Sequence, residues 1–299
     1  MTNQDKAIDI HCSVLPSETL ERLAPHSDGV YVDGTLGLGG HSEAILKQSA
    51  PNGRVIAFDW DAAAIEKSRE RLQCFGDRLT IVRRNFSEIG EGLAEVGVDK
   101  VDGILIDIGL SSLQLDMGER GFSFQRDEPL DMRMDIRREV TAASILAGCS
   151  EEELADIFYY YGEEKQARRI ANFVVQERML GPITTSTQLA DLVAKAVPRR
   201  FHPKRIHVAT LVFQALRIAV NTELENLAGI LEHGVEYLKP GARFCVISFH
   251  SLEDRMVKRK FRDNEKLKVL TKKPIVASPE ERDSNRRSRS ARLRVAEKI

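Results

Sequence analysis

Residues 29–41, GVYVDGTLGLGGH, indicate the fold of this 299-residue chain. A short apolar run ends in an acid and a glycine-rich turn, and HSEAILKQSA (residues 41–50) then has a helical pattern. Glycine permits positive φ and lets a ligand approach the backbone closely. A turn of this kind is a weak signal by itself, because any tight connection between strand and helix uses glycine. Its position at the end of an apolar strand predicts a nucleotide-binding α/β fold.

The segments that follow repeat this alternation. RVIAFDWD (54–61), LTIVRRN (79–85) and VDGILIDIG (101–109) are typical of strands, and AAAIEKSRERLQCF (62–75) is typical of a helix. VDGILIDIG is nearly all apolar, which indicates a strand buried on both faces. Alternating strands and helices at this spacing predict a parallel, doubly wound sheet with right-handed crossovers.

The pattern changes after residue 112. ELADIFYYYG (153–162), QARRIANFVVQERML (166–180) and STQLADLVAKAV (186–197) have helical periodicity, with no convincing strand between them. Strand patterns return in ARFCVISF (242–249), LKVLTKKPIVA (267–277) and ARLRVAEK (291–298), and EERDSNRRSRS (280–290) is typical of a mobile loop. We therefore expect a sheet domain formed by residues 1–112 and 213–299, interrupted by an inserted helical domain of residues 113–212.

The composition excludes several classes of protein. Hydrophobic residues make up 42% and charged residues 30% of the chain, as in an ordinary globular enzyme. No apolar run approaches the roughly 20 residues that span a bilayer, and the polar amino terminus resembles no targeting peptide. The four cysteines form no C-x-x-C pair, so neither a metal site nor a disulfide framework is expected. We expect a cytoplasmic protein.

The charge is unevenly distributed. The formal net charge is −1, but residues 254–299 contain 16 Lys and Arg against 7 Asp and Glu. This asymmetry suggests a surface for a polyanion. A solvated, ion-paired helix followed by a charged tail explains the charge equally well.

Asp59 narrows the choice of cofactor. It ends the second predicted strand, about 20 residues beyond the glycines, where an acid commonly binds ribose hydroxyls. Both a nicotinamide dinucleotide and S-adenosylmethionine fit this position. A pyrophosphate favours a regular G-x-G-x-x-G turn, whereas this chain has G-x-G-G-H. S-adenosylmethionine has no phosphate, and a neighbouring acid would suit its sulfonium and amino groups.

The third and fourth predicted strands add two candidates at the same edge of the sheet. Phe86 follows the third strand, where an aromatic ring could hold adenine, although such a residue is more often part of a core. Asp107 ends the fourth strand near the expected topological switch point, where open α/β sheets bind ligands. A carboxylate after so apolar a run is costly unless it has partners, which favours a functional role.

Six collinear segments together resemble the ribosomal RNA small subunit methyltransferase H family, the bacterial cytosine-N4 methyltransferases of 16S ribosomal RNA. The most specific are GERGFSF (118–124) and FHSLEDR (249–255). The others are DGTLGLGGHSEAIL, YGEEKQARRIA, FQALRIAVNTELE and RSRSARLRVAEK. The chain departs from the family pattern at Leu113, commonly proline, and at Leu211, commonly arginine, which leaves substrate affinity and the target more open than the cofactor.

The resemblance implies a Rossmann-like methyltransferase domain with an inserted helical domain, and S-adenosylmethionine as cofactor. It implies a cytosine in the decoding centre, at the ribosomal P site, as target, with 16S ribosomal RNA within the small ribosomal subunit as the expected partner. The implied cofactor contacts are Gly39, Gly40, His41, Asp59, Phe86, Asp107 and Gln114. The nearest alternatives are an amine methyltransferase acting on DNA or another RNA, and a ribosome-assembly factor without activity.

The chemistry suggests further residues. A cytosine amine is a poor nucleophile, which alignment and acceptors for its N–H bonds would assist. Asp107 or nearby carbonyl groups are candidate acceptors, Ser111 and Ser112 could shape the pocket, and His250 could face the substrate or only bond a loop carbonyl. The target base must be unpaired or flipped. In the helical domain Arg199, Arg200, Lys204 and Arg205 favour phosphate contact, whereas the tyrosine run 159–161 favours helix packing over base stacking.

Overall fold

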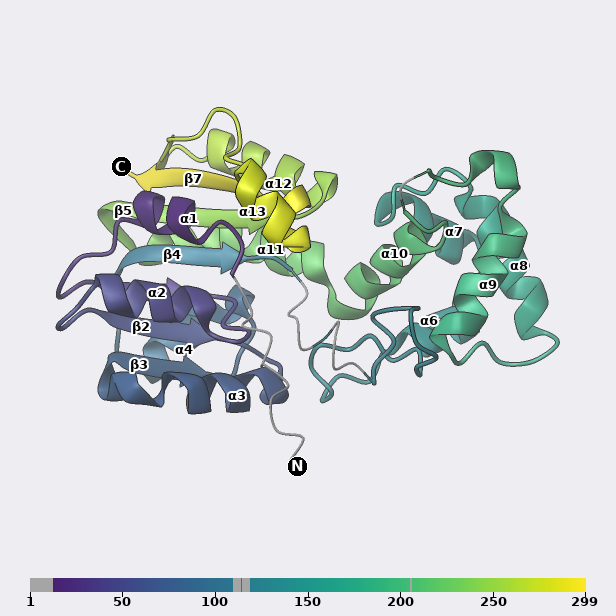
Figure 1. Ribbon diagram of the computed structural model, residues 1–299, viewed down its shortest axis with the longest axis horizontal. Coiled ribbons are helices and arrows are strands. Elements are labelled where there is room, and N and C mark those ends of the chain that lie inside the picture. Colours follow the sequence, from purple (N-terminus) through teal and green to yellow (C-terminus); the bar gives the residue numbers. More distant parts are fainter. Residues whose placement is uncertain (1–12, 110–113, 115–118, 205) are drawn as a thin grey trace, which may run out of the picture. The chain divides into compact units, whose positions relative to one another are not determined.

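The computed structural model describes residues 13–109, 114, 119–204 and 206–299. The chain divides into two compact units (Figure 1). The sheet unit comprises residues up to 112 together with 226–299, and the helical unit comprises residues 113–225. The sequence prediction ended the helical domain at Val212. The structure continues it to Glu225, because the helix Thr210–Asn221, which contains Val212, packs against two other helices of that unit.

A seven-stranded sheet forms the centre of the sheet unit, in the order β3-β2-β1-β4-β5-β7-β6. The neighbours from β3 to β5 are parallel, and β7 is antiparallel to both β5 and β6. The expected parallel, doubly wound arrangement is therefore present, with one antiparallel strand that the sequence did not indicate. The strands are β1 Val30–Asp33, β2 Arg54–Phe58, β3 Leu79–Val82, β4 Val101–Asp107, β5 Leu238–Ser248, β6 Leu267–Val269 and β7 Arg292–Lys298.

The direction of β7 follows from the path of the chain. Ser248 at the end of β5 pairs with Arg292 at the start of β7. The chain after β6 continues alongside β7 toward the end of the sheet where β5 ends, as the antiparallel bridge between Ile275 and Leu293 shows. β7 starts at that end and therefore runs in the opposite direction to β5. Only Leu267–Val269 of the long strand predicted at 267–277 is regular, since Pro274 cannot donate a hydrogen bond and two lysines precede it.

Helices cover both faces of the sheet (Figure 1). One buried cluster includes Tyr31, Ile45 and Leu72 and joins the sheet to α1, α2 and α3. The opposite cluster includes Leu93 and Phe261 and joins it to α4, α11 and α12. The helices of the sheet unit are α1 Pro16–Leu23, α2 Gly40–Gln48, α3 Ala62–Leu72, α4 Ile89–Glu95, α11 Glu223–His233, α12 Ser251–Asp263 and α13 Pro279–Ser284, with the short turns η1 Gln73–Arg78, η2 Phe86–Glu88, η4 Gly234–Tyr237 and η5 Arg286–Ser290.

The helical unit has sequence signals that fix where its helices begin. Thr141, Ser150 and Thr185 each form a capping box, in which the cap and the third residue of the helix satisfy each other's backbone N–H groups. The core includes Phe158, whereas Tyr159 and Tyr160 are 56% and 62% exposed, so helix packing accounts for only part of that aromatic run. The helices are α6 Ala142–Gly148, α7 Glu151–Tyr160, α8 Ala167–Arg178, α9 Ser186–Ala196 and α10 Thr210–Asn221, with η3 Arg199–Phe201.

The segment 280–290, predicted to be a mobile loop, is folded instead. It forms α13 and η5, and the side chain of Ser288 is 1% exposed. The Ser278 hydroxyl caps α13 by accepting the N–H of Glu281, and Asn285 caps η5 in the same way. Tertiary contacts rather than hydrophobic content hold this segment in place. Among the described helices, none combines the length and the apolar character needed to cross a bilayer.

Candidate active site

The turn after β1 lies at the carboxyl edge of the sheet, where the parallel strands end. Its backbone is tied to both neighbouring strands: the N–H of Gly34 donates to the Leu105 carbonyl at 2.8 Å, and that of Leu36 donates to the Phe58 carbonyl at 2.9 Å. Gly39 has φ +78°, and a Cβ there would lie 2.6 Å from a Leu72 methyl carbon. The turn therefore requires glycine, and it lies between β2 and β4, where the strand order reverses.

Asp33 is an acid at this turn that the sequence argument did not assign to the site. Its side chain is fully buried, and it accepts hydrogen bonds from the Ser42 hydroxyl at 2.6 Å and the Thr35 N–H at 3.1 Å. Burial raises the pKa of Asp33, and His41 with these two donors only partly reverses the shift. The signal that singled out Asp107, an acid ending an apolar strand, was equally present here. Asp33 holds the turn closed between β1 and α2.

Asp59 reaches the same turn from the end of β2. One carboxylate oxygen accepts the N–H of Gly37 at 2.8 Å, and the other accepts the N–H of Asp61 at 2.9 Å. Burial nevertheless raises the pKa of Asp59 to about 7. No lysine or arginine pairs with it among the described residues. A ligand that brings hydroxyl donors or a positive charge would stabilise its ionised form.

Asp107 and His41 face each other across the turn. The Nε2 atom of His41 lies 3.6 Å from a carboxylate oxygen of Asp107, and the backbone N–H of Asp107 donates to the Thr35 hydroxyl at 2.7 Å. Burial lowers the pKa of His41, but Asp107, together with the charges of Asp33 and Glu281, outweighs this effect and the net shift is upward. His41 Nε2 and the other Asp107 oxygen are buried without a hydrogen-bond partner in the described parts of the chain.

Asn85 and Phe86 lie at the carboxyl edge of the sheet, just after the end of β3. The Asn85 side chain is 8% exposed and caps η2 by accepting the Ser87 N–H at 2.8 Å. Its Nδ2 atom is buried and finds no acceptor among the residues described. Phe86 packs partly buried against the core, and a Cβ at Gly34 would lie 3.0 Å from Phe86 Cβ. Phe86 is therefore next to the glycine turn, and the side chain of Asn85 is a further candidate for the site.

His250 and Glu253 lie where β5 gives way to α12. Glu253 is 1% exposed, and its carboxylate accepts the N–H groups of Phe249 and His250 at 2.8 and 3.2 Å. The His250 Nε2 atom lies 2.9 Å from the other Glu253 oxygen. These two atoms are close, but both are buried without a hydrogen-bond partner among the described residues. His250 and Glu253 lie at the same edge as Asp107, because β4 and β5 are parallel neighbours.

The comparisons with known proteins give the family. The model of the MraW methylase family matches residues 9–299. This chain belongs to the MraW methylase family. Two relatives are called ribosomal RNA small subunit methyltransferase H: that of Desulfotalea psychrophila is 66% identical over 97% of this chain and 98% of its own length, and that of Geotalea daltonii is 50% identical over 97% and 98%. An rRNA methylase of Streptococcus thermophilus aligns in structure with a TM-score of 0.41 and 9% identity, over 95% of this chain and 93% of its own.

The methylase brings most of its predicted site residues to one edge. Gly39, Gly40, His41, Asp59, Phe86, Asp107 and His250 all lie at the carboxyl edge of the sheet. Gln114 is buried, at 5% exposure, and belongs to the helical unit. The predictions for Ser111, Ser112, Leu113 and Arg205 concern positions outside the described residues.

The predicted phosphate contacts of the methylase lie on its helical unit, around η3. Arg199, Arg200 and Lys204 are exposed, and no carboxylate pairs with them in the described residues of either unit. The Arg200 guanidinium lies 4.8 Å from the ring centroid of Phe201, which is itself 48% exposed. Cations interleaved with an exposed aromatic ring are typical of surfaces that bind single-stranded nucleic acid.

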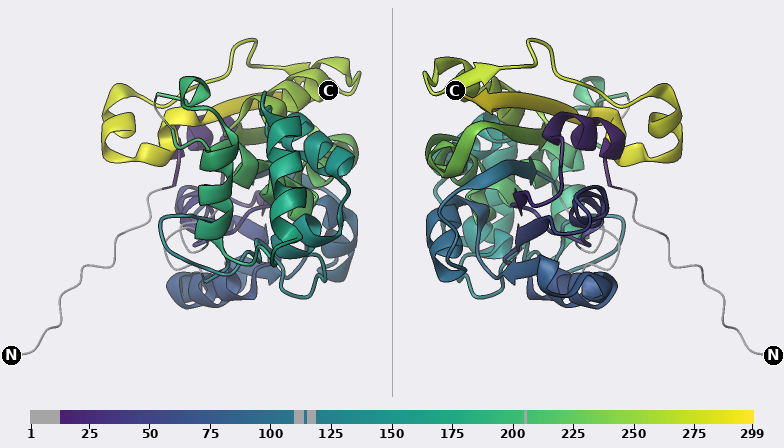
Figure 2. Two further views of the ribbon diagram at one scale, coloured as in Figure 1. Left: turned by 90° about the vertical axis from the view of Figure 1, so that its right-hand side faces the viewer. Right: turned by 90° about the vertical axis from the view of Figure 1, so that its left-hand side faces the viewer.

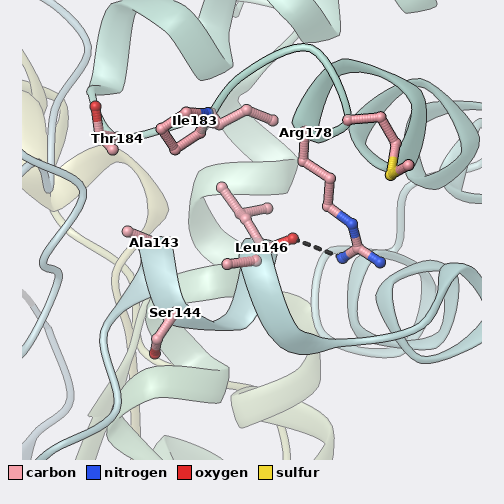
Figure 3. Close-up of a pocket in the computed structure, with 9 residues that line it drawn as sticks. Ala143, Ser144, Leu146, Arg178, Ile183 and Thr184 are labelled. Carbon is pink, nitrogen blue, oxygen red and sulfur yellow. Dashed lines mark hydrogen bonds between the residues drawn. The ribbon is translucent and has the colours of Figure 1, made fainter.

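The helical unit also contains a hollow of about 570 Å³ between α6 and the end of α8 (Figure 3). Its walls include Leu146, Ile183 and the stem of Arg178. The Arg178 guanidinium donates to the carbonyls of Leu146 at 2.8 Å and Cys149 at 2.6 Å, so it caps the end of α6. Arg178 is the only charged side chain among the residues that line the hollow, and its guanidinium is engaged in this way, so we assign the hollow no role in the reaction.

Proposed function

We propose that this chain is a methyltransferase that uses S-adenosylmethionine to methylate the N4 amine of a cytosine in the decoding centre, at the P site, of 16S ribosomal RNA. Membership of the MraW methylase family and the names of its relatives support the reaction and the small-subunit RNA. The observation that carries the proposal is the acidic edge around the glycine turn, where Asp59 and Asp107 keep unpaired capacity for a cationic ligand. The reaction then takes place in the cytoplasm, with the small ribosomal subunit as partner.

The residues present fit the cofactor. Gly39 and Gly40 are the turn residues that the family resemblance assigns to the cofactor, Asp59 would accept the ribose hydroxyls, and Phe86 would lie against the adenine. The orphaned oxygen of Asp107 and the orphaned Nε2 of His41 supply polar contacts that the described residues do not complete. We include Gln114 in the cofactor site as the family resemblance implies. When bound, S-adenosylmethionine supplies a methyl group on a positively charged sulfur.

The remaining chemistry falls to side chains of this chain. Transfer would form a bond between the cytosine nitrogen and the methyl carbon as the bond from that carbon to sulfur breaks. The nitrogen would also lose one proton, so the site needs an acceptor near it. Asp107 is the first candidate, because one of its oxygens has no described partner. His250 is the second, because it lies at the same edge and its Nε2 atom is buried without a hydrogen-bond partner among the described residues. Ser111 and Ser112, four and five residues after Asp107 in the sequence, would shape the pocket for the base.

RNA contact is assigned to the helical unit. Arg199, Arg200 and Lys204, with Arg205 next to them in sequence, would bind phosphates and so orient the RNA. These contacts carry no sequence information by themselves. The choice of cytosine would therefore rest on the pocket beside Asp107.

The test is incubation of the protein with methyl-labelled S-adenosylmethionine and small ribosomal subunits that lack the modification. We expect label in N4-methylcytidine at the P site, found by digestion and nucleoside mapping. Label in another nucleoside or in DNA would contradict the target. Cofactor and RNA binding without any label would support an assembly factor instead.

A further inference from the structure

Residues 278–290, which we call the arginine arm, form a folded projection of the sheet unit. The arm contains α13 and η5 and leads into β7 at Arg292, which pairs with the last residue of β5. It therefore lies at the carboxyl edge, the edge that carries Asp107. In the side views of Figure 2 the arm, in yellow, stands out to one side of the sheet.

Contacts to the glycine-turn region fix the arm in place. A Glu281 carboxylate oxygen accepts the N–H of Leu15 at 2.8 Å. A Cβ at Gly40 would lie 2.1 Å from the Ser13 hydroxyl, so the segment that Glu281 holds packs directly on the glycine turn. The charge of Glu281 also raises the pKa of His41, although less than the charge of Asp107 does. The arm is thus close to the proposed site of reaction.

The arm presents arginines that the fold does not neutralise. Arg286 and Arg289 are exposed, and neither has a carboxylate partner among the described residues. Arg289 donates from Nε to the Arg282 carbonyl at 3.0 Å, which leaves its terminal nitrogens outward. The Nε of Arg282 is buried and lacks an acceptor in the described chain. The acids of the arm lie before residue 284, so residues 286–289 hold three arginines and no acid.

The electrostatics of the edge explain why such an arm is needed there. Asp33, Asp59 and Asp107 converge at the edge, which suits a cationic cofactor. The same carboxylates would repel the phosphates on either side of a target nucleotide. Cations on the rim offset this repulsion without entering the cofactor site, and the guanidinium fork matches phosphate geometry.

We propose that the arginine arm binds the RNA phosphate backbone next to the target nucleotide, as a second RNA contact separate from that on the helical unit. This inference rests on the proposed function for the identity of the RNA. The arm has no apolar side chain other than Pro279, so nothing in it would insert into a lipid surface or anchor a protein partner.

The experiment compares two charge-matched double variants. Arg286→Ala with Arg289→Ala removes two cations from the arm, and Arg54→Ala with Lys268→Ala removes two exposed cations from the opposite edge of the sheet. Binding to unmodified small ribosomal subunits is measured by filter retention over a range of salt concentrations. Each lost phosphate contact lowers the slope of log K against log salt by roughly 0.7 to 0.9. We expect the arm variant to lose about 1.5 in slope and to bind on the order of tenfold more weakly near 0.15 M salt.

The control variant should bind within about twofold of the wild type, and Arg286→Lys with Arg289→Lys should restore most of the slope, since lysine keeps the charge. Three results would each overturn the proposal: an unchanged salt slope in the arm variant, an equal loss of slope in the control variant, or no subunit binding by the wild type. A loss of S-adenosylmethionine affinity at unchanged RNA binding would overturn it too, because the arm would then serve the cofactor. Methylation is scored separately: binding without N4-methylcytidine refutes the proposed function, while the arm is judged on the salt slopes alone.

Discussion

Asp59 makes cofactor binding dependent on pH, because burial raises the pKa of its carboxyl group to about 7. Ribose hydroxyls and a positive charge favour the ionised form, so binding requires loss of the proton. Below pH 7 we expect the Kd for S-adenosylmethionine to rise up to about tenfold per pH unit, with proton release on binding. Calorimetry in two buffers of different ionisation enthalpy measures both effects.

The Asp59→Asn variant should show weaker binding and a flat pH profile, while Asp77→Asn, an exposed acid at the opposite edge, should behave as the wild type. A pH-dependent Asp59→Asn variant would assign the titration to another group. The stability of the ligand-free protein should depend on pH in the opposite direction to cofactor binding. Because the pKa of Asp59 is higher in the folded state, its protonation stabilises the folded protein fully at pH values below its pKa in the unfolded chain, which is near 4. This contribution is lost as the pH rises through about 7.

A variant of Asp107 can show whether this residue acts in the methyl-transfer step or in cofactor binding. If its free oxygen accepts from the amine, Asp107→Asn should lower kcat by roughly 10²- to 10⁴-fold, the usual range for a positioned acid or base. Single-turnover methylation with subunits measures this, and calorimetry gives the cofactor affinity of the same variant. A near-normal rate would transfer the role to His250, and His250→Ala would then be the variant to test.

For single residues, the sequence predicted the positions of those at strand ends better than the positions of those that depend on contacts. Asp59, Phe86 and Asp107 follow apolar runs, and parallel strands bring such positions to one edge. Asp33 was missed because it lies within the glycine motif, although its buried hydrogen bonds hold that motif closed. The unpaired Nδ2 of Asn85 depends on how the chain turns after β3, which no local pattern encodes.

At the scale of elements, one buried ion pair fixes α12 against β7. Arg294 donates from Nε and Nη2 to the two oxygens of Asp254, at 2.6 and 3.1 Å, and both residues are under 8% exposed. Arg292 reaches the same carboxylate at 3.2 Å, but its side chain is 44% exposed. Arg294→Met should therefore cost about 3 kcal/mol of unfolding free energy, because the buried carboxylate of Asp254 would keep only the exposed Arg292 as a partner. Arg292→Met should cost less than about 1 kcal/mol.

Urea unfolding of the two methionine variants measures these losses of unfolding free energy. Equal losses in the two variants would show that the pair of Arg294 and Asp254 contributes no more than a surface ion pair. Burial opposes ionisation of Asp254, but the two arginines outweigh it and lower its pKa. The stability that this pair contributes is therefore present above pH 4 and is lost as the pH falls through the lowered pKa. Acid unfolding should begin at a higher pH in Arg294→Met than in Arg292→Met.

The elements that the sequence predicted well are those whose own residues determine them. The Rossmann-like sheet is confirmed, since its central strands are apolar runs bounded by glycine or acids. The arm was mistaken for a mobile loop because its residues are polar, and its helices depend on Glu281 reaching Leu15 and on burial of Ser288. The antiparallel course of β7 likewise depends on where the arm returns the chain.

At the scale of the whole molecule, the two units are expected to divide the work. The sheet unit contains the acidic edge and the arginine arm, and the helical unit contains the cations around η3. Cofactor binding should then be insensitive to changes at η3, whereas RNA binding should respond to changes in both units. The charges explain this expectation, since the carboxylates of the edge favour a cationic ligand, whereas the arginines of the arm and the cations around η3 favour a polyanion.

Arg199→Ala with Arg200→Ala tests this division on the helical unit. Both side chains are exposed, so the fold should tolerate the change, and the thermal midpoint should move by less than about 2 °C. Each lost phosphate contact should lower the salt slope of subunit binding by roughly 0.7 to 0.9, while the Kd for S-adenosylmethionine stays within twofold. Combining this variant with the arm variant should add the two losses in log K, since the two sites lie on separate units and share no side chain. A double loss no larger than either single loss would mean that the two surfaces do not bind the RNA independently, and the division of contacts between the units would have to be abandoned.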